Sequence, residues 1–185
     1  MLYRTSKLVL SLLFAQSSLA KEVILEPPTG AEGTPVAVIW IHGMECQPEA
    51  YQTIATEVQN VAKDGGYKAW VGVPEFLFDV PEPVLIDHYV QSTLAELKKK
   101  GFTGDNVFLA AHSLGGVMTQ IYSKGRTDIK GQILMGSVLL RDTRSLNSDG
   151  KTEFKAGIPP TLTLAGEKDG LLRITRGAES YWHQT

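Results

Sequence analysis

The chain has 185 residues, a length that suits a single domain with a sizeable hydrophobic core. Its composition, 43% hydrophobic and 21% charged, is ordinary for a globular protein and excludes a disordered or fibrous chain. A formal net charge of −2 excludes the strongly basic surface that nucleic-acid binding requires.

The first 20 residues have the three parts of a secretory signal peptide. Arg4 and Lys7 make a positive region, residues 8–15 form an apolar core, and residues 18–20 read Ser-Leu-Ala, a small-x-small cleavage site. The apolar run is too short to span a bilayer, although an uncleaved anchor is the rival interpretation. Cleavage after Ala20 predicts a protein that is secreted to the exterior or the endomembrane lumen, with no stable membrane span. It leaves 16 Lys and Arg against 20 Asp and Glu, a net charge of −4.

Cys46 is the only cysteine, so an intramolecular disulfide is excluded. A buried or idle thiol is favoured over an intermolecular bridge. The four histidines and this cysteine show no zinc-like spacing. We therefore expect no metal and no cofactor.

Strand and helix patterns alternate through residues 21–185, which are expected to form one domain. In chain order, residues 36–41 make a β-branched strand, and residues 48–64 have helical spacing that ends at Gly65. Residues 68–73 make a second strand, which ends at Pro74, and residues 75–83 read as a loop. An apolar stripe from Ile86 to Leu97 predicts a long helix that Gly101 ends.

The second half continues the alternation. It comprises a strand at 106–111, a helix at 114–124, a strand at 131–139, a polar loop at 141–157, a strand at 161–165 and a helical tail at 175–183. Such alternation predicts the α/β class: a mostly parallel central sheet with helices on both faces. Functional residues of these sheets gather at the carboxyl ends of the strands.

Residues 111–115 read Ala-His-Ser-Leu-Gly, between the strand at 106–111 and the helix at 114–124. A small-x-Ser-x-small element in that context is the sequence form of a nucleophile elbow. The sharp turn forces the serine into a strained backbone conformation and requires small neighbours two residues away on each side. Ser113 is therefore the expected nucleophile, at the amino end of a helix whose free N–H groups favour negative charge.

The spacing of His-Gly-x at residues 42–44, Ala-His-Ser-Leu-Gly-Gly at 111–116 and Gly-Glu-Lys-Asp-Gly at 166–170 resembles the α/β-hydrolase superfamily. The resemblance covers roughly residues 34–183. It is specific for the superfamily and uninformative about the substrate. It implies an oxyanion hole made by the N–H groups of Met44 and Leu114, with His42 either shaping the turn or serving only as a loop residue.

The resemblance also implies a Ser, acid, His order. Asp169 is favoured as the acid over Asp142, because it lies in a Gly-flanked turn after the last strand; a solvated loop carboxylate is the alternative for either. His183 alone follows Asp169 among the histidines, yet only 14 residues separate them and a helix is expected between them. The superfamily usually has a further helix and strand before its histidine.

We therefore expect a domain that is incomplete at its C-terminus and a 185-residue chain that hydrolyses p-nitrophenyl esters poorly. His112 is expected to pack beside the elbow and not to act as the base. Residues 76–78, Phe-Leu-Phe, line a hydrophobic substrate pocket or belong to the core.

The leading hypothesis is a serine hydrolase that cleaves carboxylic esters, from small molecules or lipids, through an acyl-enzyme on Ser113. Lipase-like, esterase-like, chlorophyllase-like and dienelactone-hydrolase-like relatives are all compatible with the pattern. The alternative is a catalytically inactive protein of the same fold, a fragment or pseudoenzyme, that binds a ligand or partner.

Overall fold

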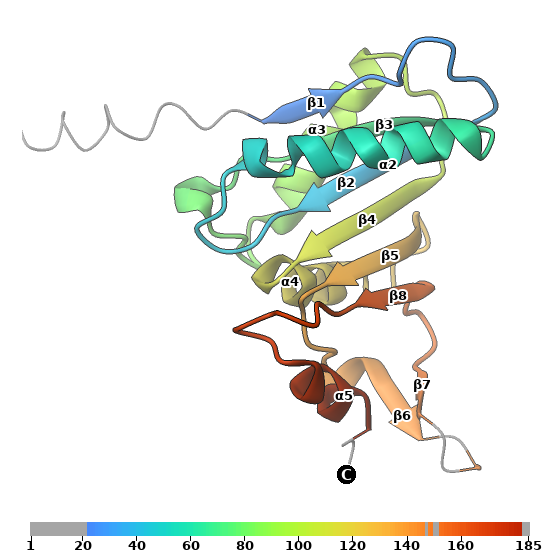
Figure 1. Cartoon of the computed structure of the whole chain (residues 1–185). Helices are drawn as coiled ribbons and strands as arrows, with labels where there is room; N and C mark the ends of the chain where they lie inside the picture. Colours follow the sequence, from blue (N-terminus) through green and yellow to red (C-terminus); the bar gives the residue numbers. More distant parts are fainter. Residues whose placement is uncertain (1–21, 147, 150–151, 183–185) are drawn as a thin grey trace, which may run out of the picture.

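Six strands form one sheet in the order β1-β3-β2-β4-β5-β8 (Figure 1). The structure is a computed structural model that describes residues 22–146, 148–149 and 152–182. All neighbouring strands are parallel except β1, which pairs antiparallel with β3 at one edge. The strands are β1 (Val23–Leu25), β2 (Thr34–Ile41), β3 (Tyr67–Val73), β4 (Val107–His112), β5 (Ile129–Met135) and β8 (Thr161–Leu164).

Helices cover both faces of the sheet, as the alternating pattern predicts. In Figure 1, α2 lies in front of the sheet, whereas α3 and α4 lie behind it. The helices are α2 (Gln52–Asp64), α3 (Ile86–Lys99), α4 (Leu114–Ser123) and α5 (Ile174–Trp182). The mostly parallel α/β architecture is thus confirmed.

Strand β2 shows why the core has two halves. Its side chains alternate between the two faces of the sheet. Ile39 and Ile41 belong to a hydrophobic cluster that includes residues of α3, and Trp40 belongs to a second cluster that includes residues of α2. Ile39 and Ile41 are fully buried. Burial of an aliphatic side chain of this size contributes about 1.5–3 kcal/mol.

Glycines end the two long helices at the positions expected from the sequence. Gly101 has a φ of +94°, and its N–H donates to the Lys98 carbonyl while the Phe102 N–H donates to Leu97. This pair of bonds is the Schellman arrangement, which satisfies carbonyls that the end of α3 leaves open. Gly66, with a φ of +78°, similarly follows α2.

Two expectations from the sequence need correction, and one strand was missed. The strand expected at 131–139 ends at Met135, because Gly136 has a φ of +51° and turns the chain toward α4, where Gln120 bonds to Val138 and Leu140. The loop expected at 141–157 contains a small antiparallel pair, β6 (Arg144–Leu146) and β7 (Thr152–Phe154). The edge strand β1 was not expected, since three residues are too short for a periodic signal.

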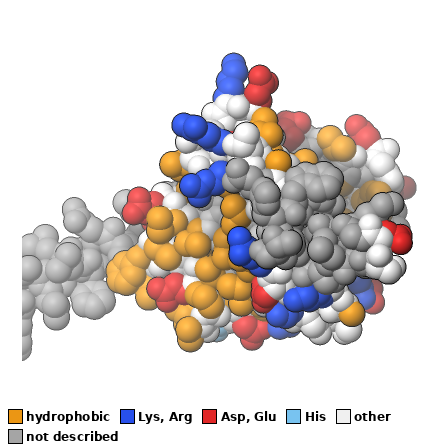
Figure 2. Space-filling model, turned by 90° about the horizontal axis from the view of Figure 1, so that it is seen from below, with side chains coloured by type: hydrophobic (Ala, Val, Ile, Leu, Met, Phe, Trp, Pro, Cys, Tyr) orange, Lys and Arg blue, Asp and Glu red, His pale blue; other side chains and the backbone are white. Residues whose placement is uncertain are grey.

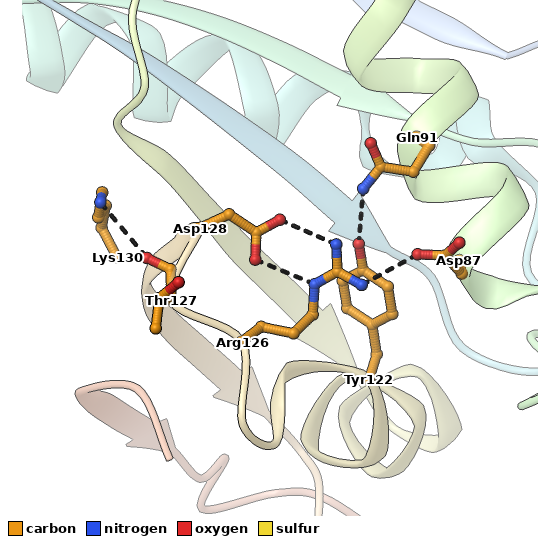
Figure 3. A network of polar contacts seen from close by, with 7 residues as sticks. All are labelled: Asp87, Gln91, Tyr122, Arg126, Thr127, Asp128 and Lys130. Atoms are coloured by element: carbon orange, nitrogen blue, oxygen red, sulfur yellow. Dashed lines mark hydrogen bonds and ion pairs between the residues drawn. The ribbon is translucent and has the colours of Figure 1, made fainter. Parts of the chain in front are cut away.

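A polar network ties α3 to the connection between α4 and β5 (Figure 3). The Arg126 guanidinium makes two hydrogen bonds to Asp128, at 3.1 and 2.9 Å, and one to Asp87 at 3.0 Å. It also lies 4.3 Å from the ring centre of Tyr122, whose hydroxyl accepts a bond from Gln91. A planar guanidinium can donate two hydrogen bonds to one carboxylate and stack on an aromatic ring at the same time, which an ammonium group cannot do.

Candidate active site

Ser113 has the strained backbone expected of a nucleophile elbow. Its φ and ψ are 52° and −123°, a conformation that residues with a side chain rarely adopt. Strand β4 ends at His112 and helix α4 begins at Leu114, so the whole turn is this one residue. The Ser113 N–H donates to Met135, and its carbonyl accepts from Gly116, which anchors the turn to the sheet and the helix.

The small residues after the serine are required by close backbone contact. A Cβ at position 115 would lie 2.3 Å from the Ile41 carbonyl oxygen and 2.5 Å from that of His42. Position 116 is equally tight, because a Cβ there would lie 2.4 Å from the Ser137 hydroxyl. The first turn of α4 therefore sits directly on the carboxyl end of β2.

The turn at residues 42–44 lies against the serine and presents a backbone N–H. A Cβ on Gly43 would be 3.3 Å from the Ser113 Cβ. The Gly43 carbonyl accepts bonds from His42 Nδ1 at 2.8 Å and from the Cys46 N–H at 3.3 Å. Because a peptide unit is planar and trans, the Met44 N–H points opposite to that carbonyl. It has no acceptor within the part of the chain that the structure describes.

His42 supports this turn through its hydrogen bond to the Gly43 carbonyl. Its side chain is fully buried, its ring packs edge-on against Phe76 at 4.8 Å, and its Nε2 has no partner among the described residues. Burial lowers the pKa of His42, so the ring stays neutral. A carbonyl acceptor at Nδ1 fixes the proton on that nitrogen.

Asp169 is held by backbone donors after β8. Its Oδ1 accepts the N–H groups of Leu172 at 2.8 Å and Leu171 at 2.9 Å, and these bonds hold the pKa of the carboxyl below its usual value. Asp142 is elsewhere engaged: it forms an exposed ion pair with Lys124 at 2.9 Å, which lowers its own pKa.

Three of the four histidines are described, and none bonds to the Ser113 hydroxyl. His42 is buried as above, His88 is exposed on α3, and His112 Nδ1 lies 2.8 Å from the Tyr51 hydroxyl. His183 lies outside the described residues, as does the signal peptide. Helix α5 lies beside the segment that follows β5, since the Ser180 hydroxyl accepts a hydrogen bond from the Leu139 N–H at 3.3 Å.

Tyr51 is a site residue that the sequence did not indicate. It belongs to the 3₁₀ turn Pro48–Tyr51 before α2, and its hydroxyl accepts the Gly43 N–H at 3.0 Å. In the sequence it reads only as one apolar residue of a helical face, so no local signal could have found it.

Apolar side chains stand at the edge of the sheet where the strands end. Met44 and Leu77 are each 54% exposed and Phe78 is 79% exposed, whereas Phe76 belongs to the core. Phe78 and Asp79 have positive φ, and the Asp79 carbonyl accepts the Glu45 N–H at 2.9 Å, which joins this loop to the turn beside Ser113. Figure 2 shows that hydrophobic side chains also gather on the face of the molecule seen from below.

Within residues 22–146, 148–149 and 152–182, no group of three or more His, Cys, Asp or Glu residues is arranged to hold a metal ion. No helix in those residues has the length and apolar character needed to cross a membrane.

Comparison with known proteins gives likenesses of structure and none of sequence. No family model and no curated protein matches the chain. The fold is similar to that of Est1E from Butyrivibrio proteoclasticus, at 16% identity and a TM-score of 0.54, over 87% of this chain and 80% of that one. It is also similar to esterase PE8, at 13% identity and a TM-score of 0.56, over 86% and 80%.

A third similar structure is XC6422 from Xanthomonas campestris, described as an α/β serine hydrolase without a lid. It has 13% identity and a TM-score of 0.56, over 85% of this chain and 70% of that one. At such identities the likeness is one of fold, and it agrees with the parallel sheet and the elbow described above.

Proposed function

We propose that this chain, which belongs to the α/β-hydrolase superfamily by its fold, is a serine hydrolase that cleaves carboxylic esters through an acyl-enzyme on Ser113. The observation that carries the proposal is the strained φ of 52° at Ser113, set between strand and helix with the 42–44 turn against it. Backbone strain of this kind persists where the surrounding structure imposes it, and it is concentrated at functional sites.

The reaction follows from the groups around Ser113. A base takes the hydroxyl proton while the oxygen attacks the ester carbonyl carbon, and the carbonyl oxygen becomes an oxyanion. The N–H groups of Met44 and Leu114 stabilise that charge; Leu114 begins α4, so its N–H is not used within the helix. Collapse of this intermediate breaks the ester C–O bond, and the protonated base gives its proton to the departing alcohol. Water, deprotonated by the same base, then attacks the acyl carbon, which releases the acid and restores the Ser113 hydroxyl.

Asp169 is the proposed acid that orients the base. Two backbone N–H groups hold Oδ1, and the lone pairs of Oδ2 can accept the N–H of an imidazole. His183 is our candidate for that imidazole, because it follows Asp169 in the chain and adjoins the end of α5. Substitution His183→Ala should then abolish ester hydrolysis.

The alternative function is ligand binding without turnover. It is favoured by one observation: the Ser113 hydroxyl has no hydrogen-bond partner among the described residues. His42 and His112 bond to other groups, and His88 is exposed on α3. In that case ester analogues would bind, while no acyl-enzyme would form.

The proposed substrates are small esters or lipid esters with an apolar or aromatic group. The exposed side chains of Met44, Leu77 and Phe78 beside the 42–44 turn support this class. Est1E has been solved with ferulic acid bound, which supports a small aromatic acid as the acyl group.

Export is also part of the proposal, because residues 1–20 have the composition of a signal peptide. Expression in a secreting host should give a mature protein that begins at Lys21. An N-terminal sequence that begins at Met1 in the secreted fraction would contradict cleavage.

The function is tested by comparing p-nitrophenyl butyrate hydrolysis by the 185-residue chain with that by Ser113→Ala and His183→Ala. Turnover that both substitutions destroy supports the proposed hydrolase. Turnover retained by Ser113→Ala refutes it. Saturable binding of the ester analogue without any turnover supports the binding protein.

A further inference from the structure

A chain of hydrogen bonds runs through the site from the 42–44 turn to the elbow. The Gly43 N–H donates to the Tyr51 hydroxyl at 3.0 Å, and that hydroxyl lies 2.8 Å from His112 Nδ1. Tyr51 is buried and His112 is half-buried, and their ring centres are 6.0 Å apart. The reaction described above uses neither side chain.

The direction of the first bond is fixed, and that of the second depends on the tautomer of His112. The Gly43 N–H can only donate, so the Tyr51 oxygen accepts there. Burial raises the pKa of Tyr51, so the phenol keeps its proton and can donate it to His112 Nδ1. A neutral His112 that accepts at Nδ1 carries its own proton on Nε2.

The other edge of the His112 ring faces the acid. A Cβ on Gly136 would lie 3.1 Å from Asp169 Oδ2 and 3.7 Å from His112 Nε2, so both groups border the same small space. Gly136 keeps that space open and also needs its φ of +51°. The backbone N–H groups of Leu171 and Leu172 occupy the other oxygen of Asp169.

We propose that Tyr51 and His112 are positioning residues of one relay, in which two hydrogen bonds join the oxyanion turn at Gly43 to His112, and the His112 ring lies across a small space from the Asp169 carboxylate. Tyr51 holds the Gly43 N–H and fixes the tautomer of His112, and the Nε2–H of His112 is directed at Asp169 Oδ2. The inference rests on the proposed function, since it gives the relay a role in that reaction.

The relay makes a spectroscopic prediction that does not depend on activity. In the protein labelled with ¹⁵N-histidine, at about pH 8 where imidazole is ordinarily neutral, His112 should be protonated on Nε2 and unprotonated on Nδ1. In Tyr51→Phe this tautomer should lose its dominance, because the donor to Nδ1 is gone. A wild-type His112 that carries its proton on Nδ1 overturns the proposal, whether or not the protein is a hydrolase.

The kinetic test separates positioning from packing. Tyr51→Phe keeps the ring against Trp40 and should lower kcat for p-nitrophenyl butyrate about tenfold, with KM changed by less than about twofold. His112→Phe should do the same, and the double variant should lose about tenfold and not a hundredfold, because both changes break one relay.

Tyr122→Phe is the matched control, since that hydroxyl is also buried and bonds to Gln91 on α3, away from this turn. It should stay within about twofold of wild type. Equal kcat for Tyr51→Phe and Tyr122→Phe, or a double variant with multiplied losses, overturns the positioning role. Full activity in Ser113→Ala would instead refute the hydrolase, and the tautomer measurement would still decide the relay.

Discussion

Substitution of Gly115 by alanine tests the elbow with the smallest possible change. The added Cβ would lie 2.3 Å from the Ile41 carbonyl oxygen, about 1 Å closer than the 3.4 Å at which ordinary contact begins. That oxygen belongs to β2, which is paired on both sides by β3 and β4, so the strand cannot move away easily. Relief requires α4 and Ser113 to shift.

The cost follows from this overlap. Overpacking costs about 1–3 kcal/mol, whereas alanine in a helix gains about 1 kcal/mol over glycine, so a net loss of up to about 2 kcal/mol is expected. A displacement of about 1 Å at the reacting oxygen should lower kcat about a hundredfold. Gly115→Val, which is larger and branched, should fold poorly or not at all.

Urea unfolding followed by circular dichroism, together with p-nitrophenyl butyrate hydrolysis, measures both effects. Gly65→Ala is the control: the nearest atom to its Cβ is at 3.4 Å and its φ is −83°. Its unfolding free energy should change by no more than about 0.5 kcal/mol. Gly115→Ala with wild-type stability and wild-type kcat, or a soluble and fully active Gly115→Val, would show that residues 111–115 do not form an elbow.

Three further predictions follow from other contacts. Asp169→Asn should lower kcat about 10³–10⁴-fold, because the amide favours the wrong imidazole tautomer. Asp142→Asn should leave kcat near wild type. A larger loss in Asp142→Asn than in Asp169→Asn would make Asp142 the acid. Arg126→Lys should lower the free energy of unfolding in urea by about 1 kcal/mol, because the two-bond contact with Asp128 and the ring contact are lost. Lys124→Ala breaks a more exposed ion pair and should lower it by less than about 0.5 kcal/mol. Equal losses in the two variants would show that the network does not stabilise the fold. Burial lowers the pKa of His42 from 6.5, so the unfolded chain binds a proton that the folded chain does not, and stability should fall as the pH drops below about 6.5. His42→Gln should show a weaker fall over the same range, and identical pH dependence of the two proteins would contradict this cause.

Much of the fold could be predicted because its signals are local. Three signals depend only on residues that are close together in the sequence: the β-branched run at 36–41, the apolar stripe from Ile86 to Leu97 and the glycine at 101. The edge strand β1 and the pair β6–β7 escaped prediction because three-residue strands are defined by their partners. The end of β5 was placed too late because residues 137–139 are apolar, although Gly136 turns them toward α4.

Some residues of the site could likewise be predicted from the sequence, and others could not. Ser113 and the turn at 42–44 are recognisable because each sits in a short motif whose small residues are required by backbone contact. Tyr51 is recognisable only in three dimensions, where its hydroxyl meets Gly43 and His112. The proximity of His112 to Asp169 likewise depends on how β4, β5 and β8 lie side by side, which no spacing in the sequence expresses.

Everything proposed for this site depends on Ser113 being an activated nucleophile. The most direct measurement is reaction of the 185-residue chain with a fluorophosphonate probe, followed by peptide mapping by mass spectrometry. We expect a covalent adduct on Ser113 that is absent from Ser113→Ala and unchanged in Ser137→Ala, whose hydroxyl is buried beside Gly116. No adduct, or an adduct that persists at the same rate in Ser113→Ala, would contradict it.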